Sequence, residues 1–209
     1  EPKIKFKKTY KPIVLEGGAI DVNGKGSILL TEECLLSKTQ QRNKGFKKKD
    51  YEKYLSKLLN INNFIWLKKG IEGDDTHGHI DDISRFVSEN TIMTAVEKNK
   101  NEKNFQILND NLIILKKAKN KNKKKFKIIK IPMPKPIFID NIKVPASYLN
   151  FLITNKTVMV PIFEDKNDIK VIRIFKKFFR KRKIIGINCK KLIWGFGAVH
   201  CMTLQEPSI

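Results

Sequence analysis

Short strand-like runs alternate with helical patterns along the whole chain, and this alternation restricts the possible folds more than any other feature of the sequence. The runs are rich in Ile, Val and Phe, and several end at Gly, Pro or Asn. They cover residues 13–16, 27–31, 64–67, 91–96, 126–131, 157–163 and 183–188. Strands that alternate with helices of ordinary length predict an α/β architecture.

Three apolar stripes at helical spacing lie between these runs. We expect Asp50 to cap the first helix, and Asn167 or Asp168 to open the third. The stripes are Tyr51, Tyr54, Leu55 and Leu58, then Phe105, Leu108, Leu112 and Leu115, and finally Val171, Ile172, Phe175 and Phe179.

Two further segments have a biased composition. Residues 116–130 are nearly all Lys and Asn before Phe126, which predicts a solvated helix end followed by a loop. Residues 131–144 contain three prolines, which predicts an extended connection or an edge strand. No composition break marks a boundary, so we expect residues 1–209 to form a single domain.

The chain is strongly basic, with 43 basic against 21 acidic residues and a formal net charge of +22. Such an excess is typical of nucleic-acid-binding proteins, because bound cations release counterions from the phosphates. Here 38 of the 43 basic residues are Lys and only 5 are Arg, whereas readers of bases and phosphates favour the planar fork of Arg. We therefore interpret the charge mainly as compositional drift, and a lysine-rich nucleic-acid-binding module is the alternative.

The sequence gives no indication of a membrane partner or of a disulfide framework. No apolar run approaches the ~20 residues of a membrane helix, and the first residues do not resemble a secretion signal. The three cysteines are Cys34, Cys189 and Cys201. Their odd number favours a reducing cytoplasm, and they lack the CxxC spacing typical of a zinc site.

Two acidic segments stand apart from the lysine-rich background. Glu16 lies between an apolar run and two glycines, where a strand end and close backbone packing often present a working side chain. Residues 70–82 contain five acids and no Lys or Arg, together with His77 and His79. His79 and Asp81 are two positions apart, so on a strand both would point to one face.

A third segment, residues 194–201, ends in His200 and Cys201 after two glycines. The two glycines allow the backbone to pack closely, which would present the thiol to a cavity. The alternative is a buried structural cysteine. A nucleophilic cysteine needs its thiolate form, which neighbouring cations or histidines favour.

Together the three segments supply a thiol, an imidazole and at least two carboxylates. Carboxylates bind a planar guanidinium through paired hydrogen bonds. Carboxylates beside a cysteine raise the pKa of its thiol, whereas a bound guanidinium would lower that pKa again. A reaction on a guanidino substrate would therefore give a role to the side chains of all three segments.

The same segments resemble the agmatine deiminase family, which includes the bacterial-type peptidylarginine deiminases. The similarity runs in the family's order and spacing over essentially the whole chain. It implies the pentein fold, an α/β propeller of five ββαβ modules around a central active site. The matching segments are VLEGGAIDVNGKGSILLTEECLL (14–36), WLKKGIEGDDTHGHIDDISRFV (66–87), PMPKP (132–136), PASYLNF (145–151) and WGFGAVHCMTLQEP (194–207).

The resemblance implies roles for five residues. Cys201 matches the nucleophile and His79 the general acid/base, while Asp81 and Glu16 match acids that bind the guanidinium; Asp75 would face the far end of the substrate. In the family mechanism, Cys201 attacks the guanidino carbon, ammonia leaves a covalent thiouronium, and water then releases a ureido product. The expected reaction is agmatine to N-carbamoylputrescine and ammonia, and no metal or organic cofactor is required.

The sequence departs from the family pattern in three ways. Phe196 and Ala198 replace a Gly and an Asn of the nucleophile motif, and His77 replaces an Asp. These changes affect the pocket and not the reaction, so we expect deimination, with arginine or peptidylarginine as alternatives to agmatine as the substrate. A metal-dependent hydrolase that uses His77, His79 and the aspartates is a further alternative.

The third departure is length. The family carries an upstream Arg-Asp motif, and this chain contains no Arg-Asp dipeptide. We therefore expect the chain to be the C-terminal portion of a deiminase, about the last three of five modules, with little turnover by itself. The expected partners are a guanidino substrate and either the missing modules or further copies of the chain.

Overall fold

The protein is built from three successive units with the same order of elements. The computed structural model describes residues 13–206. The first unit comprises β1 (Asp21–Val22), β2 (Ser27–Thr31), α2 (Lys48–Leu59) and β3 (Asn63–Leu67). The second comprises β4 (Ser84–Ser88), β5 (Thr91–Val96), α3 (Lys103–Lys117) and β6 (Lys127–Pro132). The third comprises β9 (Leu152–Ile153), β10 (Thr157–Ile162), α4 (Asp168–Phe178) and β11 (Lys183–Asn188).

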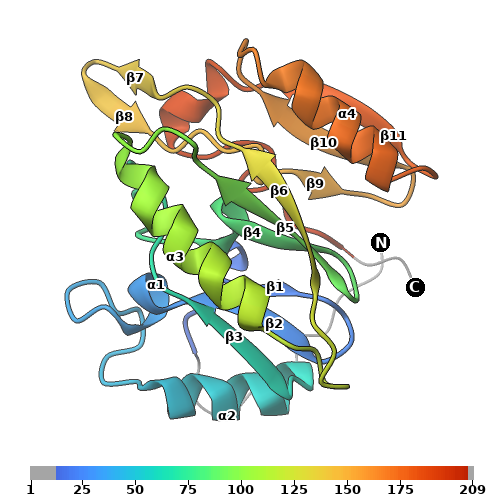
Figure 1. Cartoon of the computed structure of the whole chain (residues 1–209). Coiled ribbons are helices and arrows are strands. Elements are labelled where there is room, and N and C mark those ends of the chain that lie inside the picture. Colours follow the sequence, from blue (N-terminus) through green and yellow to red (C-terminus); the bar gives the residue numbers. More distant parts are fainter. Residues whose placement is uncertain (1–12, 207–209) are drawn as a thin grey trace, which may run out of the picture.

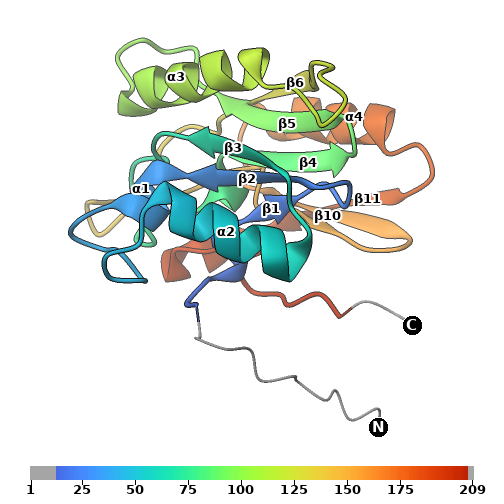
Figure 2. The ribbon, with the colours of Figure 1, turned by 90° about the horizontal axis from the view of Figure 1, so that it is seen from below.

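Each unit forms its own three-stranded sheet with one antiparallel and one parallel pair. The first strand pairs antiparallel with the second, and the second pairs parallel with the third. A helix makes each crossover between the parallel strands, as parallel pairing requires. Figures 1 and 2 show α2, α3 and α4 lying toward different sides of the molecule, each beside its own sheet. The sequence prediction of an α/β architecture is confirmed.

The three predicted helices are present and bury most of the predicted stripes, although Leu58 of the first stripe is 42% exposed. Leu108 and Leu115 of α3 and Val171 and Phe175 of α4 are buried. Helix α4 begins at Asp168 with Asn167 as its N-cap residue, as predicted. The predicted cap at Asp50 is wrong, because α2 begins two residues earlier at Lys48; the Asp50 carboxylate instead accepts a hydrogen bond from the Lys47 backbone N–H at 2.8 Å.

Six of the seven predicted strand runs are strands, and the first is wrong. Residues 13–16 are not a strand, because the backbone of Val14 is paired with a side chain. The Val14 N–H donates to Asn43 Oδ1, and the Asn43 amide donates to the Val14 carbonyl oxygen, each at 2.8 Å. A short 3-10 turn, η1 (Gly17–Ala19), follows directly.

Several short elements lie between or beside the main strands and helices of the units. They are α1 (Glu32–Leu36), the 3-10 turns η2 (Ile80–Asp82) and η3 (Leu192–Gly195), and the hairpin of β7 (Ile137–Ile139) and β8 (Ile142–Val144). The hairpin lies in the proline-containing segment that was predicted to be extended. No helix within residues 13–206 is both long enough and apolar enough to cross a membrane.

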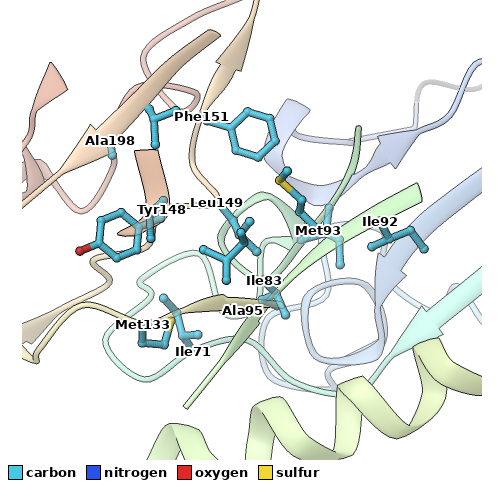
Figure 3. Packing of buried hydrophobic residues seen from close by; sticks show 14 of the residues in the cluster. Ile71, Ile83, Ile92, Met93, Ala95, Met133, Tyr148, Leu149, Phe151 and Ala198 are labelled. Atoms are coloured by element: carbon cyan, nitrogen blue, oxygen red, sulfur yellow. The ribbon is translucent and has the colours of Figure 1, made fainter. Parts of the chain in front are cut away.

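The segment before β9 is anchored in the main hydrophobic core. Tyr148, Leu149 and Phe151 are each at most 1% exposed. They belong to the same core cluster as Met93 of the second unit and Ala198 of the C-terminal segment, all of which Figure 3 labels. Buried aromatic and aliphatic side chains fix a backbone by close packing. The polar residue between them, Asn150, is therefore held rigidly.

Candidate active site

Four of the five predicted site residues lie outside the three sheets, at a 3-10 turn or in the segment that follows one. Glu16 is the N-cap residue of η1, His79 is the N-cap residue of η2, and Asp81 lies within η2. Turn η1 packs against η2. Cys201 follows η3, in a turn near the end of the described chain.

Gly18 is the point of closest approach between η1 and η2. A Cβ atom at Gly18 would collide with His79 Nδ1 and would lie 2.9 Å and 3.0 Å from the two carboxylate oxygens of Asp81. Beside it, Glu16 Oε2 is 3.6 Å from His79 Nε2. Glycine is thus the residue that lets the backbone of η1 contact both side chains.

Asp81 connects this group to the thiol. Cys201 Sγ is 3.5 Å from Asp81 Oδ2, and His200 Nδ1 is 2.7 Å from the same oxygen. Gly197 supports the close turn of the C-terminal segment, since a Cβ there would lie 2.8 Å from Cys201 Cβ. The structure therefore brings Glu16, His79, Asp81 and Cys201 into one group of side chains.

Asn150 holds the thiol segment against the acids, and the sequence analysis gave it no role. Its Oδ1 accepts hydrogen bonds from the backbone N–H groups of His200 at 2.9 Å and Cys201 at 3.2 Å. Its Nδ2 lies 2.9 Å from Cys201 Sγ and 3.0 Å from Asp82 Oδ1. The only sequence signal for Asn150 was its place in the PASYLNF match.

Asp74 shapes the loop that presents His79. Its Oδ2 accepts hydrogen bonds from the backbone N–H groups of Gly78 at 2.8 Å and His79 at 3.0 Å. Gly78 has a φ of 103°, which a side chain would oppose. Asp75 and His77 are exposed on the same loop, and the role of Asp75 stays a prediction.

The acids beside the thiol differ in their ionisation. Burial would raise the pKa of Asp81, but the hydrogen bond and charge of His200, together with the charges of Arg85 and His79, hold that pKa below its usual value. Burial, followed by the charges of Asp81 and Asp74, raises the pKa of Asp82 well above its usual value. Partial burial of the sulfur and then the charges of Asp81 and Asp82 raise the pKa of the Cys201 thiol.

Unpaired polar atoms are concentrated in this group. Within residues 13–206, four buried side-chain nitrogen or oxygen atoms have no hydrogen-bond partner, and three of them are Glu16 Oε2, His79 Nε2 and Asp81 Oδ1. Buried polar atoms are normally paired, because leaving one unpaired costs about 1–3 kcal/mol. Two oxygens and one ring nitrogen are thus free to bind a polar ligand.

Other features could hold ligands but involve different residues. A groove of about 430 Å³ is lined by Glu97, Met133 and Lys170, among others, and by none of the predicted site residues. Two groups of side chains have metal-ligating atoms within 4.8 Å of one another: Glu16 with Cys34 and His79, and Asp81 with Asp82 and Cys201. His77 belongs to neither group, which argues against a metal-dependent hydrolase built on His77.

The fold and the site together define a pentein-type α/β protein. Solved pentein structures align with it, including the agmatine deiminase of C. jejuni with substrate bound, which is 31% identical with a TM-score of 0.87 and covers 96% of this chain and 58% of that chain. The agmatine deiminase of Enterococcus faecalis is 32% identical with a TM-score of 0.86, and covers 93% and 57% respectively.

Sequence comparison gives the family. The chain belongs to the Porphyromonas-type peptidyl-arginine deiminase family, whose model matches residues 2–207. A protein of Marinomonas sp. (strain MWYL1), to which agmatine deiminase activity is provisionally assigned, is 34% identical over 215 residues. That match covers 95% of this chain, and the chain spans 58% of the length of that relative.

Proposed function

We propose that this chain contributes to the hydrolytic deimination of a guanidino substrate, with agmatine converted to N-carbamoylputrescine and ammonia. The observation that carries the proposal is the set of unpaired atoms on Glu16, His79 and Asp81 beside the Cys201 thiol. The two unpaired carboxylate oxygens, Glu16 Oε2 and Asp81 Oδ1, are hydrogen-bond acceptors, so the site suits the N–H groups of an amidine better than the oxygen of a carbonyl substrate.

A guanidinium group fits these acceptors. It presents several N–H donors in one plane, and carboxylate oxygens receive them as short charge-assisted hydrogen bonds. Glu16 keeps Oε2 unpaired because Arg42 Nε binds only Oε1, at 2.8 Å. Asp81 keeps Oδ1 unpaired because His200 and Cys201 approach only Oδ2. Each acid therefore has one oxygen available to the substrate.

Binding of the cation would also prepare the nucleophile. In the free protein the raised pKa of Cys201 keeps the thiol protonated at neutral pH. A guanidinium between the acids and the sulfur offsets the negative charges that raise this pKa, so it favours the thiolate. The thiol would then become reactive only when its substrate is bound.

The proposed reaction has two covalent steps. The Cys201 thiolate forms a bond to the guanidino carbon, His79 donates a proton to one nitrogen, and the C–N bond breaks to release ammonia. His79 then takes a proton from water as the water oxygen bonds to the same carbon. The C–S bond breaks, the thiolate is regenerated, and the ureido product leaves. Glu16, close to His79 Nε2, would orient the imidazole during both proton transfers.

We further propose that the chain is one deiminase domain and about three of the five modules of a propeller. Three ββαβ units are present in residues 13–206, and the chain spans 57% to 59% of the six solved deiminase structures it matches. Three fifths of a five-module fold agrees with that share. The activity is therefore assigned to the whole protein, and further modules or a second copy are the proposed partners.

The proposed setting is a reducing one. The three cysteines are free, and a thiol nucleophile needs protection from oxidation. This supports a cytoplasmic location and a place in putrescine formation, where a carbamoyl-transfer or hydrolytic step would consume the ureido product.

The test is ammonia release by the full-length protein from agmatine, free arginine and a peptide containing arginine. We expect the highest turnover with agmatine; preference for the peptide would support the alternative that the family description suggests. Cys201→Ala should abolish turnover, whereas Cys189→Ala changes a buried cysteine outside the site and should retain it. Unchanged turnover in Cys201→Ala would exclude the mechanism.

A further inference from the structure

Cys34 lies behind the substrate-binding acids, and the proposed reaction does not use it. It is the third residue of α1 and is fully buried. One metal-ligating atom of Cys34, one of Glu16 and one of His79 all lie within 4.8 Å of one another. A thiol, an imidazole and a carboxylate from three separate segments thus meet at one point.

Two of these three groups have unpaired atoms at this point. His79 is 7% exposed, and its buried Nε2 has no hydrogen-bond partner in the protein. Nε2 is 3.6 Å from Glu16 Oε2, which is also buried and unpaired. A second observation therefore accompanies the buried cysteine: a nitrogen and an oxygen next to it are available to a ligand.

The surrounding structure fixes the positions of the three groups. The Thr31 side chain accepts a hydrogen bond from the Cys34 backbone N–H at 3.2 Å and so holds the first turn of α1. Asp74 holds the backbone of His79. Arg42 holds Glu16 by the opposite oxygen, Oε1. Rigid backbone around a group of ligand atoms lowers the cost of arranging them about an ion.

The donor set is the one that zinc prefers. Zinc binds cysteine sulfur at about 2.3 Å, histidine nitrogen at about 2.0–2.1 Å and carboxylate oxygen at about 2.0–2.2 Å, with tetrahedral geometry. Such bond lengths place neighbouring ligand atoms roughly 3.4–3.6 Å apart. Because the three ligand atoms all lie within 4.8 Å of one another, side-chain shifts of about 1 Å would bring them to this spacing.

We propose that Glu16, Cys34 and His79 form a binding site for a single zinc ion, with its fourth position open to water. A thiolate and a carboxylate would balance the charge of the ion. The other group of ligating residues, Asp81, Asp82 and Cys201, is the less suitable one, because His200 and Asn150 already occupy carboxylate oxygens there. The ion takes the His79 nitrogen and the Glu16 oxygen that substrate turnover would need, so zinc would inhibit. This last consequence rests on the proposed function; the binding itself does not.

The direct test is titration of the full-length protein with Co²⁺, whose thiolate complexes show a sulfur-to-metal charge-transfer absorption, followed by displacement with Zn²⁺. We expect one equivalent of Co²⁺ with this absorption. Cys34→Ser should abolish the absorption and weaken zinc binding by at least about 100-fold, more than loss of a ligand's supporting residue costs. Cys189→Ser is the matched control, because it replaces another buried free cysteine.

Further variants decide the outcome if Cys34→Ser unfolds, which thermal unfolding would reveal. Glu16→Gln and His79→Gln should each weaken metal binding, whereas Cys201→Ser should leave the absorption intact. Absence of stoichiometric binding, or an absorption that is lost in Cys201→Ser and kept in Cys34→Ser, would overturn the proposal. In turnover assays Cys34→Ser should resist zinc inhibition. An inactive protein that still binds the metal through Cys34 would instead refute the proposed function alone.

Discussion

Replacing Gly18 by alanine tests how closely the backbone of η1 must approach the side chains of His79 and Asp81, which are proposed to act in catalysis. The new Cβ would lie 2.9 Å and 3.0 Å from the Asp81 oxygens and would collide with His79 Nδ1, whereas ordinary contact begins at about 3.4 Å. Asp81 must therefore retreat by about 0.5 Å, and His79 by more. Because all three contacting atoms belong to side chains, the side chains yield and the fold remains.

The expected result is a selective loss of turnover. A misplacement of about 1 Å at a reacting group can cost about 10²-fold in rate, so we expect kcat for ammonia release by the full-length protein to fall about 100-fold. The free energy of unfolding should fall by only about 1–3 kcal/mol, the usual cost of overpacking.

Gly17→Ala is the matched control, because no atom lies within 4 Å of its Cβ position. It should keep both turnover and stability. Equal turnover in the two variants would refute the reasoning that η1, His79 and Asp81 form one closely fitted site.

Three further changes probe the thiol segment and the acids. Asn150→Ala removes the acceptor of two backbone N–H groups and the donor to Asp82. The free energy of unfolding measured in urea should therefore fall by about 2–4 kcal/mol. A fall of less than about 1 kcal/mol would contradict this role. The raised pKa of Asp82 means that its charged carboxyl destabilises the folded protein, so Asp82→Asn should raise the free energy of unfolding at pH 8. The gain should disappear as the pH falls, because the carboxyl of the unchanged protein then becomes neutral. A gain that grows on acidification would contradict a raised pKa. Alkylation of Cys201 by iodoacetamide, followed by peptide mass spectrometry, should increase with pH through a midpoint above the ordinary thiol pKa of about 8.5, and a midpoint below it would show that the acids do not raise that pKa.

The helices and most of the strands could be predicted because their signal is local. Buried side chains recur along α3 and α4 at the spacing of one helix face, as at Leu108 and Leu115 or at Val171 and Phe175. Short elements lack such a repeat. Strand β4, with the sequence SRFVS, was missed because its exposed end and its polar residues hide any alternation.

The failed strand at 13–16 and the missed helix start show the limit of local patterns. Val14 is paired by the side chain of Asn43, 29 positions away, and no neighbouring residue signals that contact. Helix α2 begins after Lys47 and not after Asp50. Asp50 misled the prediction because a carboxylate can accept a hydrogen bond from a backbone N–H from within the first turn as well as from before it.

The site shows the same division. Glu16, His79, Asp81 and Cys201 could be singled out because their residue types carry chemistry and stand in unusual local sequences. Asn150 and Asp74 could not, because they act by hydrogen bonds to backbone groups that only the folded chain brings near them. Their amide and carboxylate resemble those of many surface residues in a chain this polar.

The covalent bond to Cys201 is the most direct test of the account. Full-length protein should be quenched in acid during turnover of agmatine, digested and analysed by mass spectrometry. We expect the peptide that contains Cys201 to gain the mass of agmatine less ammonia, and the peptides that contain Cys34 and Cys189 to remain unmodified. Turnover without any adduct on Cys201, or an adduct on another cysteine, would contradict the account.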